Sequence, residues 1–150
     1  LVATAFLSVA TPLADSAQSS YDEQEQLIAQ IQADKRAVVL KAMAFDDAQL
    51  TAFTPIYDKY QTERKALMQR GAELLNAFAS NYDSMTDDAA KGLLKDWFKL
   101  QDDEAKLVRE TAKKLDKVLP STKVLRFVQV ENKLNTLLRL PALQGIPLAQ

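Results

Sequence analysis

The chain has 150 residues, of which 47% are apolar and 26% charged, and its net charge is −1 with no cysteine or histidine. This length suits one domain with a modest hydrophobic core, and the near-neutral charge provides no basic field to attract nucleic acid. Without cysteine and histidine there are no disulfides, thiol nucleophiles or usual zinc ligands, and the commonest general base is missing. Glycine is scarce, which favours long helices over a sheet with many turns.

The N-terminal segment differs from the rest of the chain. Val2 to Ala10 is an uncharged apolar run, and small residues follow at Ala14 and Ser16. Such a run is too short to cross a bilayer, and with these flanks it is typical of the core and cleavage region of a secretory signal. We therefore predict a signal peptide over 1–16, truncated at its start, and export of the mature chain without a transmembrane segment. The alternative is an apolar N-terminal helix packed on the domain.

The first helix of the domain is predicted from about Tyr21 to Met43. This stretch contains neither glycine nor proline. Ser20 is followed three residues later by Glu23, which is the pattern of a capping box at a helix start. The first half of the helix is polar, so we expect its N-terminal turns to fray.

The second helix is predicted from Asp47 to Tyr82. Asp46 and Gln49 form a capping box before it, and Phe45 precedes the cap as the first residue of a hydrophobic staple. Apolar side chains then recur at alternating spacings of three and four, which indicates a long helix packed lengthwise on another. This seam contains Leu50, Phe53, Tyr57, Tyr60, Leu67, Leu74 and Phe78, with Arg64 and Gly71 in the remaining positions.

Pro55 lies within this predicted helix. Because proline lacks a backbone N–H and crowds the preceding turn, we expect a bend there. The alternative is that Thr54 caps a new helix with Pro55 at its first position.

The third helix is predicted from Asp87 to Leu119. Thr86 is its N-cap, and Met85 takes the staple position before the cap. Pro120 then ends the helix, because proline cannot continue the backbone hydrogen bonding.

Ser121 is predicted to cap a fourth helix, which ends at Pro141. The chain therefore reads as one helical domain over 17–140, followed by an apolar C-terminal tail over 141–150. Four helices with short links and no strand pattern predict an all-α elongated antiparallel hairpin or bundle.

Three charged residues, Arg64, Glu104 and Glu131, fall on otherwise apolar stripes. We interpret them as paired interior charges that fix the register of the helices, because all three could face one another in a bundle. The alternative is a polar binding spot.

The apolar surface of the helices is wider than a two-helix seam requires. Trp97 and Phe98 are adjacent and cannot both point along one narrow stripe, and Ile56 and Tyr57 raise the same problem. The excess predicts either a dimer interface or an exposed apolar patch for partners. The candidate contact residues, each of which could equally be core, are Phe53, Ile56, Tyr57, Trp97, Phe98 and Phe127.

No catalytic, cofactor-binding or metal-binding residues are predicted. A di-iron carboxylate bundle normally needs Glu-x-x-His on two helices, which a chain without histidine cannot supply. The carboxylates at 102–104 are better explained as a solvated helix face. We therefore expect a protein that is not an enzyme.

Two short stretches resemble the paired LTxxQ motif of the Spy/CpxP-like periplasmic proteins. They are "FDDAQ" at Phe45–Gln49 and "MTDDA" at Met85–Ala89, where alanine replaces the final glutamine. The resemblance extends over about Lys35 to Leu140. It implies an elongated helical hairpin, often dimerising into a curved cradle, in a periplasmic stress protein. Some relatives bind metal through histidine, cysteine or methionine, and we do not carry that property over.

The resemblance implies two functions. One is ATP-independent, chaperone-like holding of unfolded envelope proteins by weak apolar contacts. The other is that of a structural or regulatory adaptor that docks on one dedicated envelope partner, such as a sensor kinase domain. Neither involves nucleic acid, and a homodimer is compatible with both.

Overall fold

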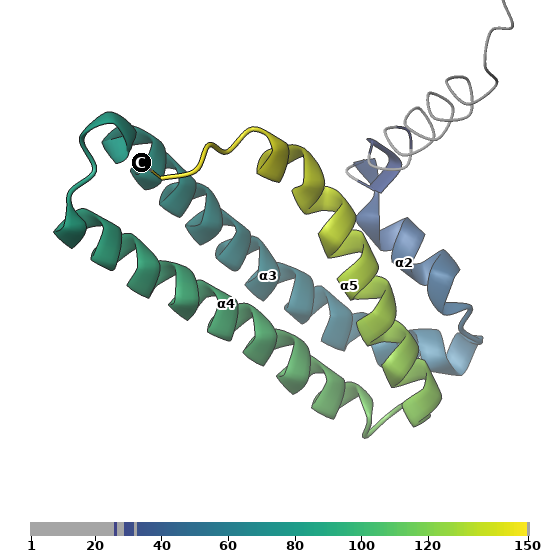
Figure 1. Cartoon of the computed structure of the whole chain (residues 1–150). Coiled ribbons are helices and arrows are strands. Elements are labelled where there is room, and N and C mark those ends of the chain that lie inside the picture. Colours follow the sequence, from purple (N-terminus) through teal and green to yellow (C-terminus); the bar gives the residue numbers. More distant parts are fainter. Residues whose placement is uncertain (1–25, 27–28, 32, 150) are drawn as a thin grey trace, which may run out of the picture.

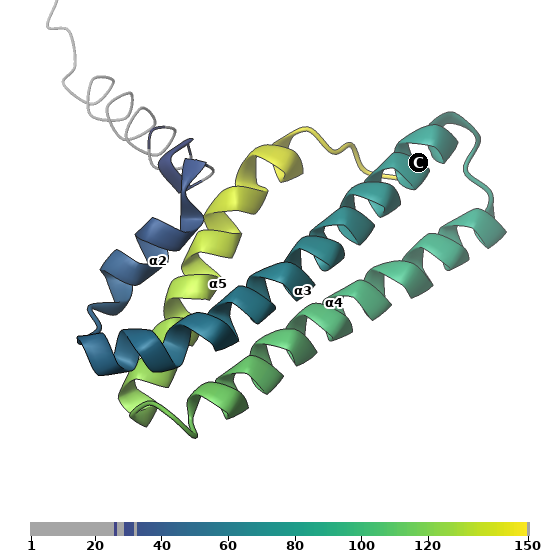
Figure 2. The same ribbon diagram turned by 180° about the vertical axis from the view of Figure 1, so that it is seen from behind.

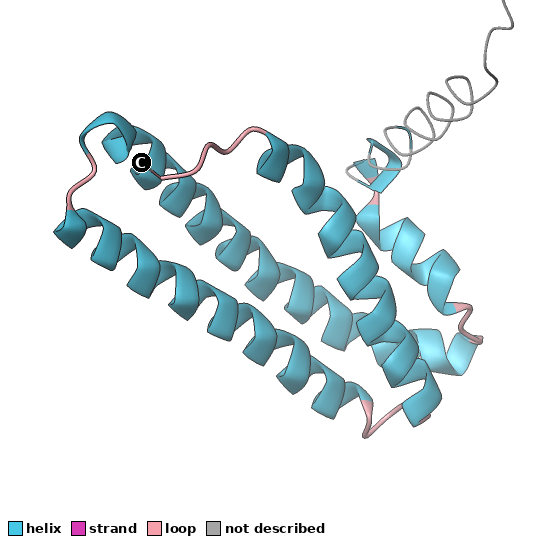
Figure 3. Ribbon diagram, viewed as in Figure 1, coloured by secondary structure: helices cyan, strands magenta, loops and turns pink. Residues whose placement is uncertain are grey.

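The computed structural model describes residues 26, 29–31 and 33–149, and within these residues it is all-helical and contains no strand (Figures 1 and 3). The predicted fold class is therefore confirmed. The predicted signal peptide lies outside the described residues. The main helices are α2 (Lys35–Met43), α3 (Asp47–Asn81), α4 (Asp87–Leu115) and α5 (Ser121–Gln144), and a single 3₁₀ turn, η1 (Tyr82–Ser84), joins α3 to α4.

Helices α3 and α4 form a long antiparallel hairpin, and α5 folds back beside it with α2 on its outer side (Figures 1 and 2). Both α2 and α5 lie toward the open end of the hairpin, where α3 begins and α4 ends. The closed end, around η1, extends beyond them. We call the part of the hairpin beside α2 and α5 the covered half, and the part around η1 that extends beyond them the projecting half.

The predicted continuous helix from Tyr21 to Met43 is wrong in one respect, because Asp34 interrupts it. Asp34 adopts φ −151°, and its side chain accepts a hydrogen bond from the N–H of Ala37 at 2.9 Å. An aspartate in this position caps a new helix start, so α2 begins only at Lys35. The predicted start of the helix, at Tyr21, lies outside the described residues.

Helix α3 begins as predicted. Asp46 Oδ1 accepts from the N–H of Gln49 at 2.8 Å, and the Gln49 side chain accepts from the N–H of Asp46 at 3.4 Å, which is a complete capping box. Pro55 lies inside α3 and does not begin a new helix. The hydroxyl of Thr54 instead donates to the carbonyl of Leu50 at 2.8 Å, so the alternative capping role of Thr54 is wrong. Figure 2 shows the first turns of α3 at an angle to the rest, as a proline within a helix predicts.

The link between α4 and α5 differs from the prediction. Helix α4 ends at Leu115 rather than Leu119. Ser121 is the first residue of α5 and not its cap, because its hydroxyl donates to Asp116 Oδ1 at 2.6 Å. The Pro120 carbonyl accepts instead from the N–H groups of Lys123 at 2.8 Å and Val124 at 3.2 Å, the third and fourth residues of α5.

Pro141 does not end α5, which continues to Gln144. Proline removes one backbone hydrogen bond, and a helix already supported by its neighbours tolerates that loss better than an isolated one. The segment beyond the helix therefore begins at Gly145.

The core lies in the covered half and is built on four aromatic rings. Phe127 of α5 packs edge-on against Phe53, Tyr57 and Tyr60 of α3, with ring centroids 5.9, 6.3 and 5.5 Å apart. Such pairs each contribute about 0.5–1.5 kcal/mol beyond their buried area. Apolar side chains of α2, α4, α5 and the segments next to them complete the cluster, namely Ile31, Val39, Met43, Leu107, Leu115, Leu119, Val124 and Leu134.

The projecting half of the hairpin has no comparable core. Every residue from 65 to 99 is at least partly exposed, although the apolar seam of α3 continues through this region. A pair of helices can bury only the line along which they touch, and the rest of a wide apolar stripe needs a third layer. Neither α2 nor α5 supplies that layer here (Figure 1).

Candidate functional site

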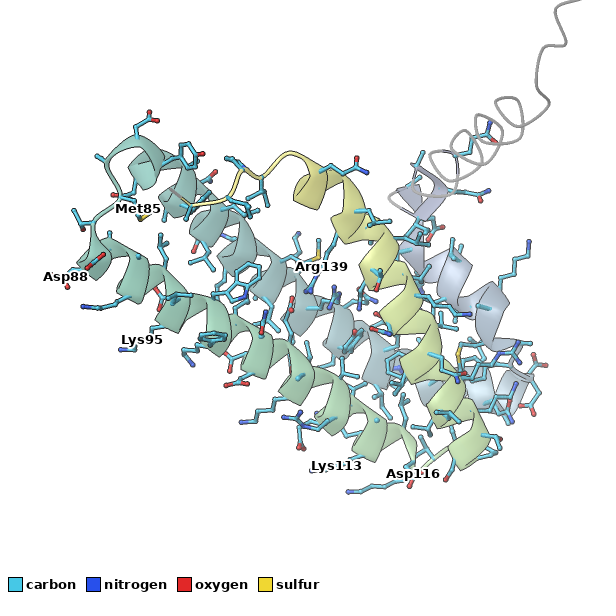
Figure 4. The ribbon with its side chains drawn as sticks, viewed as in Figure 1. Met85, Asp88, Lys95, Lys113, Asp116 and Arg139 are labelled. Atoms are coloured by element: carbon cyan, nitrogen blue, oxygen red, sulfur yellow. The ribbon has the colours of Figure 1, made fainter. Side chains whose placement is uncertain are left out.

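A large apolar groove lies at the closed end of the hairpin, and we call it the tip groove. Its volume is about 640 Å³, within the usual range for ligand sites. Helices α3 and α4 form its two sides, and Met85 lies at its closed end (Figure 4). Its helical lining comprises Leu74, Leu75 and Phe78 of α3, Met85 before α4, and Ala90, Leu93, Leu94 and Trp97 of α4.

The exposed fractions of the lining side chains are large. Leu94 is 54% exposed and Trp97 is 41% exposed. Burying an aliphatic or aromatic side chain contributes about 1.5–3 kcal/mol, so leaving several of them in water forgoes a large part of the stability available to a small domain. An apolar surface of this kind indicates a binding site for another apolar group.

The remaining wall of the tip groove is the C-terminal segment. Beyond Gln144 the chain leaves α5 and runs without helix to the end of α3 (Figure 1). Ile146, Pro147, Leu148 and Ala149 all line the groove. Ile146 is half-buried, whereas Leu148 is 89% exposed.

The described residues contain a second unusual feature, a buried carboxylate in the covered half. Glu131 of α5 is 1% exposed. Its Oε2 atom accepts hydrogen bonds from Lys35 Nζ and from the Tyr60 hydroxyl, each at 2.8 Å, and its Oε1 lies 3.5 Å from the Tyr57 hydroxyl. Three helices therefore meet at one carboxylate, which we call the Glu131 cluster.

The electrostatics of the Glu131 cluster follow from burial. Desolvation lowers the pKa of Lys35, although the charge of Glu131 opposes the shift. Desolvation and then the charge of Glu131 raise the pKa of Tyr57 and of Tyr60 far above their ordinary value of 10.0. The protein itself supplies the donors that bind Glu131, so we interpret the cluster as a structural anchor rather than as a binding spot.

The three charged residues singled out in the sequence do not form one group. Glu131 is paired with Lys35, and Arg64, 6% exposed, lies near enough for its charge to act on Lys35 and Tyr60. Glu104 is paired instead with Arg139, which extends from α5 toward α4 (Figure 4). The expectation that all three face one another is therefore wrong for Glu104.

The six candidate contact residues divide into two sets. Phe53, Tyr57 and Phe127 are 0–1% exposed and belong to the core, so they are not available to a partner in this structure. Trp97 and Phe98 are exposed at 41% and 58%, and Trp97 lines the tip groove. Ile56 is half-buried beside a small hollow between α3 and α4.

The residues of the two LTxxQ-like stretches are helix caps. Phe45 packs its ring on Phe53 with centroids 4.7 Å apart, beside the Asp46 capping box. Thr86 caps α4 by accepting from the N–H of Ala89 at 3.2 Å, as predicted. Met85 also lines the tip groove, so one of the two stretches touches the candidate site.

The sequence analysis did not identify several of the groove residues as candidate contact residues, although they occur in adjacent apolar pairs. Leu74 with Leu75, and Leu93 with Leu94, are adjacent apolar pairs like Trp97 with Phe98. Adjacent residues on a helix lie about 100° apart, so one member of each pair falls outside a narrow seam. Such pairs alone do not locate the groove, because Ile56 with Tyr57 and Leu107 with Val108 are adjacent in the same way and lie in or against the core.

Other kinds of site receive no support within the part of the chain that the structure describes. No group of three or more acidic residues is placed to hold a metal ion there. Likewise, none of the described helices combines the length and apolar character that a membrane span requires.

No family model, curated protein or solved structure matches the chain.

Proposed function

We propose that this protein is a non-catalytic, periplasmic binding protein whose tip groove holds extended apolar segments of unfolded client proteins without ATP. The observation that carries this proposal is the uncovered apolar seam of the projecting half. The resemblance of Phe45–Gln49 and Met85–Ala89 to the Spy/CpxP-like motif is consistent with it.

The shape of the groove favours a chain segment over a compact ligand. It lies between two helices, is partly open to solvent, and is lined by apolar side chains of both, among them Leu74 on α3 and Leu93 and Trp97 on α4. An apolar groove between two helices can accept the apolar side chains of an extended or helical peptide. Such contacts are non-directional, so they select apolar character rather than a particular sequence.

The chemistry of the lining favours holding over conversion. None of the lining residues carries a titratable side chain. General acid–base and nucleophilic catalysis both need a positioned titratable or nucleophilic group at the reacting atoms. A groove lined only by apolar side chains can bind and release, which is the activity that a holding protein needs.

The test is suppression of aggregation, measured by light scattering with an unfolding model client and no ATP. The informative variant is Leu94→Asp, which places a charge in the groove. Its matched control is Leu125→Asp on α5, because Leu125 is 60% exposed, close to the 54% of Leu94, and does not line the groove. We expect suppression by the wild type and by Leu125→Asp, and a loss of about tenfold or more for Leu94→Asp, since burying an unpaired charge costs several kcal/mol.

Equal activity of the two variants would show that clients bind elsewhere. No suppression by the wild type over a range of salt concentrations would contradict the client-holding proposal. Capture of one dedicated envelope partner, lost in Leu94→Asp alone, would then assign the groove to an adaptor.

A further inference from the structure

We propose that the C-terminal segment Gly145–Ala149, which we call the tail, is a built-in competitor that occupies the tip groove of its own chain. Client binding then requires displacement of the tail, so the tail sets the apparent affinity of the groove. This inference concerns regulation, and it rests on the proposed function of the groove as a client site.

The path of the chain brings the tail to the groove. Helix α5 packs on the covered half and ends at Gln144, and the tail then crosses to the projecting half near the end of α3 (Figures 1 and 2). The residues from Ile146 to Ala149 line the groove together with Leu74, Phe78 and Trp97 of the hairpin. The tail therefore covers part of the apolar surface that α5 leaves exposed.

The chemistry of the tail is that of a client segment. Its sequence from Ile146 to Ala149 is Ile-Pro-Leu-Ala, which is apolar and uncharged. Pro147 fixes its own φ and disfavours the helical conformation for Ile146, so the segment is already extended before it docks. An extended apolar segment in the groove is a direct structural example of the ligand that we propose.

The contact is weak enough to be reversible. Ile146 is the half-buried side chain of the tail, whereas Leu148 is 89% exposed and the flanking residues are exposed as well. A single half-buried aliphatic side chain cannot hold a segment permanently against its conformational entropy.

The tether compensates for the weak contact. A ligand joined by a few residues acts at an effective concentration in the millimolar range. A free client at micromolar concentration competes only if it makes more apolar contacts than Ile146 does. The tail would therefore exclude segments with little apolar character and admit unfolded chains that offer several apolar residues at once.

The first experiment uses the full chain with Ile146→Asp and the matched control Leu148→Asp. Both variants add one negative charge to the tail, but only the first places it at the half-buried position. Trp97 is the single tryptophan of the chain and lines the groove, so its fluorescence reports on the groove alone. We expect Ile146→Asp to shift the emission of Trp97 to longer wavelength, increase its quenching by acrylamide and increase binding of anilinonaphthalene sulfonate, while Leu148→Asp stays close to the wild type.

The second experiment measures binding of a reduced and alkylated, permanently unfolded model protein to the same three chains. If the tail occupies most of the grooves, removing it raises the apparent affinity by roughly threefold to tenfold. We expect this gain for Ile146→Asp and not for Leu148→Asp.

The outcomes separate the inference from the proposed function. Unchanged Trp97 fluorescence in Ile146→Asp would overturn the competitor role, even if the wild type binds the unfolded protein. A Trp97 shift without any client binding would confirm that the tail docks but contradict its role as a competitor of clients. A gain of the same size in both variants would also overturn it, because charge rather than release of Ile146 would then be the cause.

Discussion

The Tyr60 hydroxyl lies 2.8 Å from Glu131 Oε2, and this contact joins α3 to α5 inside the core. Lys35 binds the same oxygen from α2, so a single carboxylate holds three helices in register. The projecting half of the hairpin contains no anchor of this kind among its described residues, and every residue there is at least partly exposed. The same two long helices therefore carry a half with a buried core and a half without one.

Glu131→Ala should destabilise the fold by about 3 kcal/mol, because it removes the acceptor of the buried Tyr60 hydroxyl and of the half-buried Lys35 ammonium group. Glu131→Gln keeps an acceptor oxygen and should cost less. Urea unfolding followed by circular dichroism measures both. Glu63→Ala is the control, since Glu63 and its partner Lys59 are 47% and 67% exposed in their side chains and such pairs contribute about 0–1 kcal/mol. Equal losses for Glu131→Ala and Glu63→Ala would contradict the anchoring role of the cluster.

Stability should fall steeply above pH 10. The pKa of Tyr57 and of Tyr60 is raised in the folded state from the ordinary value of 10.0, so above pH 10 the unfolded chain loses protons that the folded chain retains. The stabilisation is therefore fully present below pH 10 and is lost as the pH rises, at about 2.7 kcal/mol per pH unit for two groups. Urea midpoints at several pH values test this.

Tyr60→Phe should roughly halve that alkaline slope, because one of the two groups no longer titrates. The lowered pKa of Lys35 acts in the opposite direction, since stability from this group grows as the pH rises toward 10.5. We therefore expect the free energy of unfolding to reach a maximum near pH 10 rather than to stay constant below it. An unchanged slope in Tyr60→Phe would show that alkaline unfolding has another cause.

Ala44→Gly should stabilise the protein by up to about 1 kcal/mol. Ala44 ends α2 in the left-handed region at φ 47° and ψ 58°, where a side chain costs about 1–2 kcal/mol and glycine nothing, although glycine also adds freedom to the unfolded chain. Ala105→Gly in the exposed face of α4 is the matched control and should destabilise by about 0.5–1 kcal/mol. A loss of stability in both variants would contradict the strain at Ala44.

Gly92→Ala and Gly71→Ala should each stabilise the hairpin by about 0.5–1 kcal/mol, because both glycines lie inside helices. An added Cβ at Gly92 meets no atom within 4 Å, and at Gly71 it would lie 3.5 Å from Leu100 Cδ2, an ordinary contact distance. Calorimetry should show a rise in the melting temperature for both. A lower value for Gly71→Ala alone would mean that α3 and α4 need the glycine for close approach.

The helices and their caps could be predicted from the sequence, because those features depend on neighbours in the chain. Asp46 with Gln49 and Thr86 with its following turn are local patterns, and α3 begins and ends within one residue of the expected positions. The errors were at Asp34, at the end of α4, at Ser121 and at Pro141. At each of these positions the prediction used only the preference of the residue itself. Whether the residue caps, continues or ends a helix depends also on packing and hydrogen bonds, which the sequence does not show.

The candidate site could be predicted only in part. Phe53, Tyr57 and Trp97 are all aromatic residues on the apolar sides of predicted helices. The sequence alone therefore cannot tell which of them are buried and which are exposed. The tertiary structure separates them, because α5 starts beside the open end of the hairpin and is too short to reach its closed end (Figure 1). Sequence alone therefore determined that this chain forms long amphipathic helices with more apolar surface than two helices can bury. Only the tertiary structure decided which part of that surface the third layer covers, since coverage depends on contacts between residues far apart in the chain.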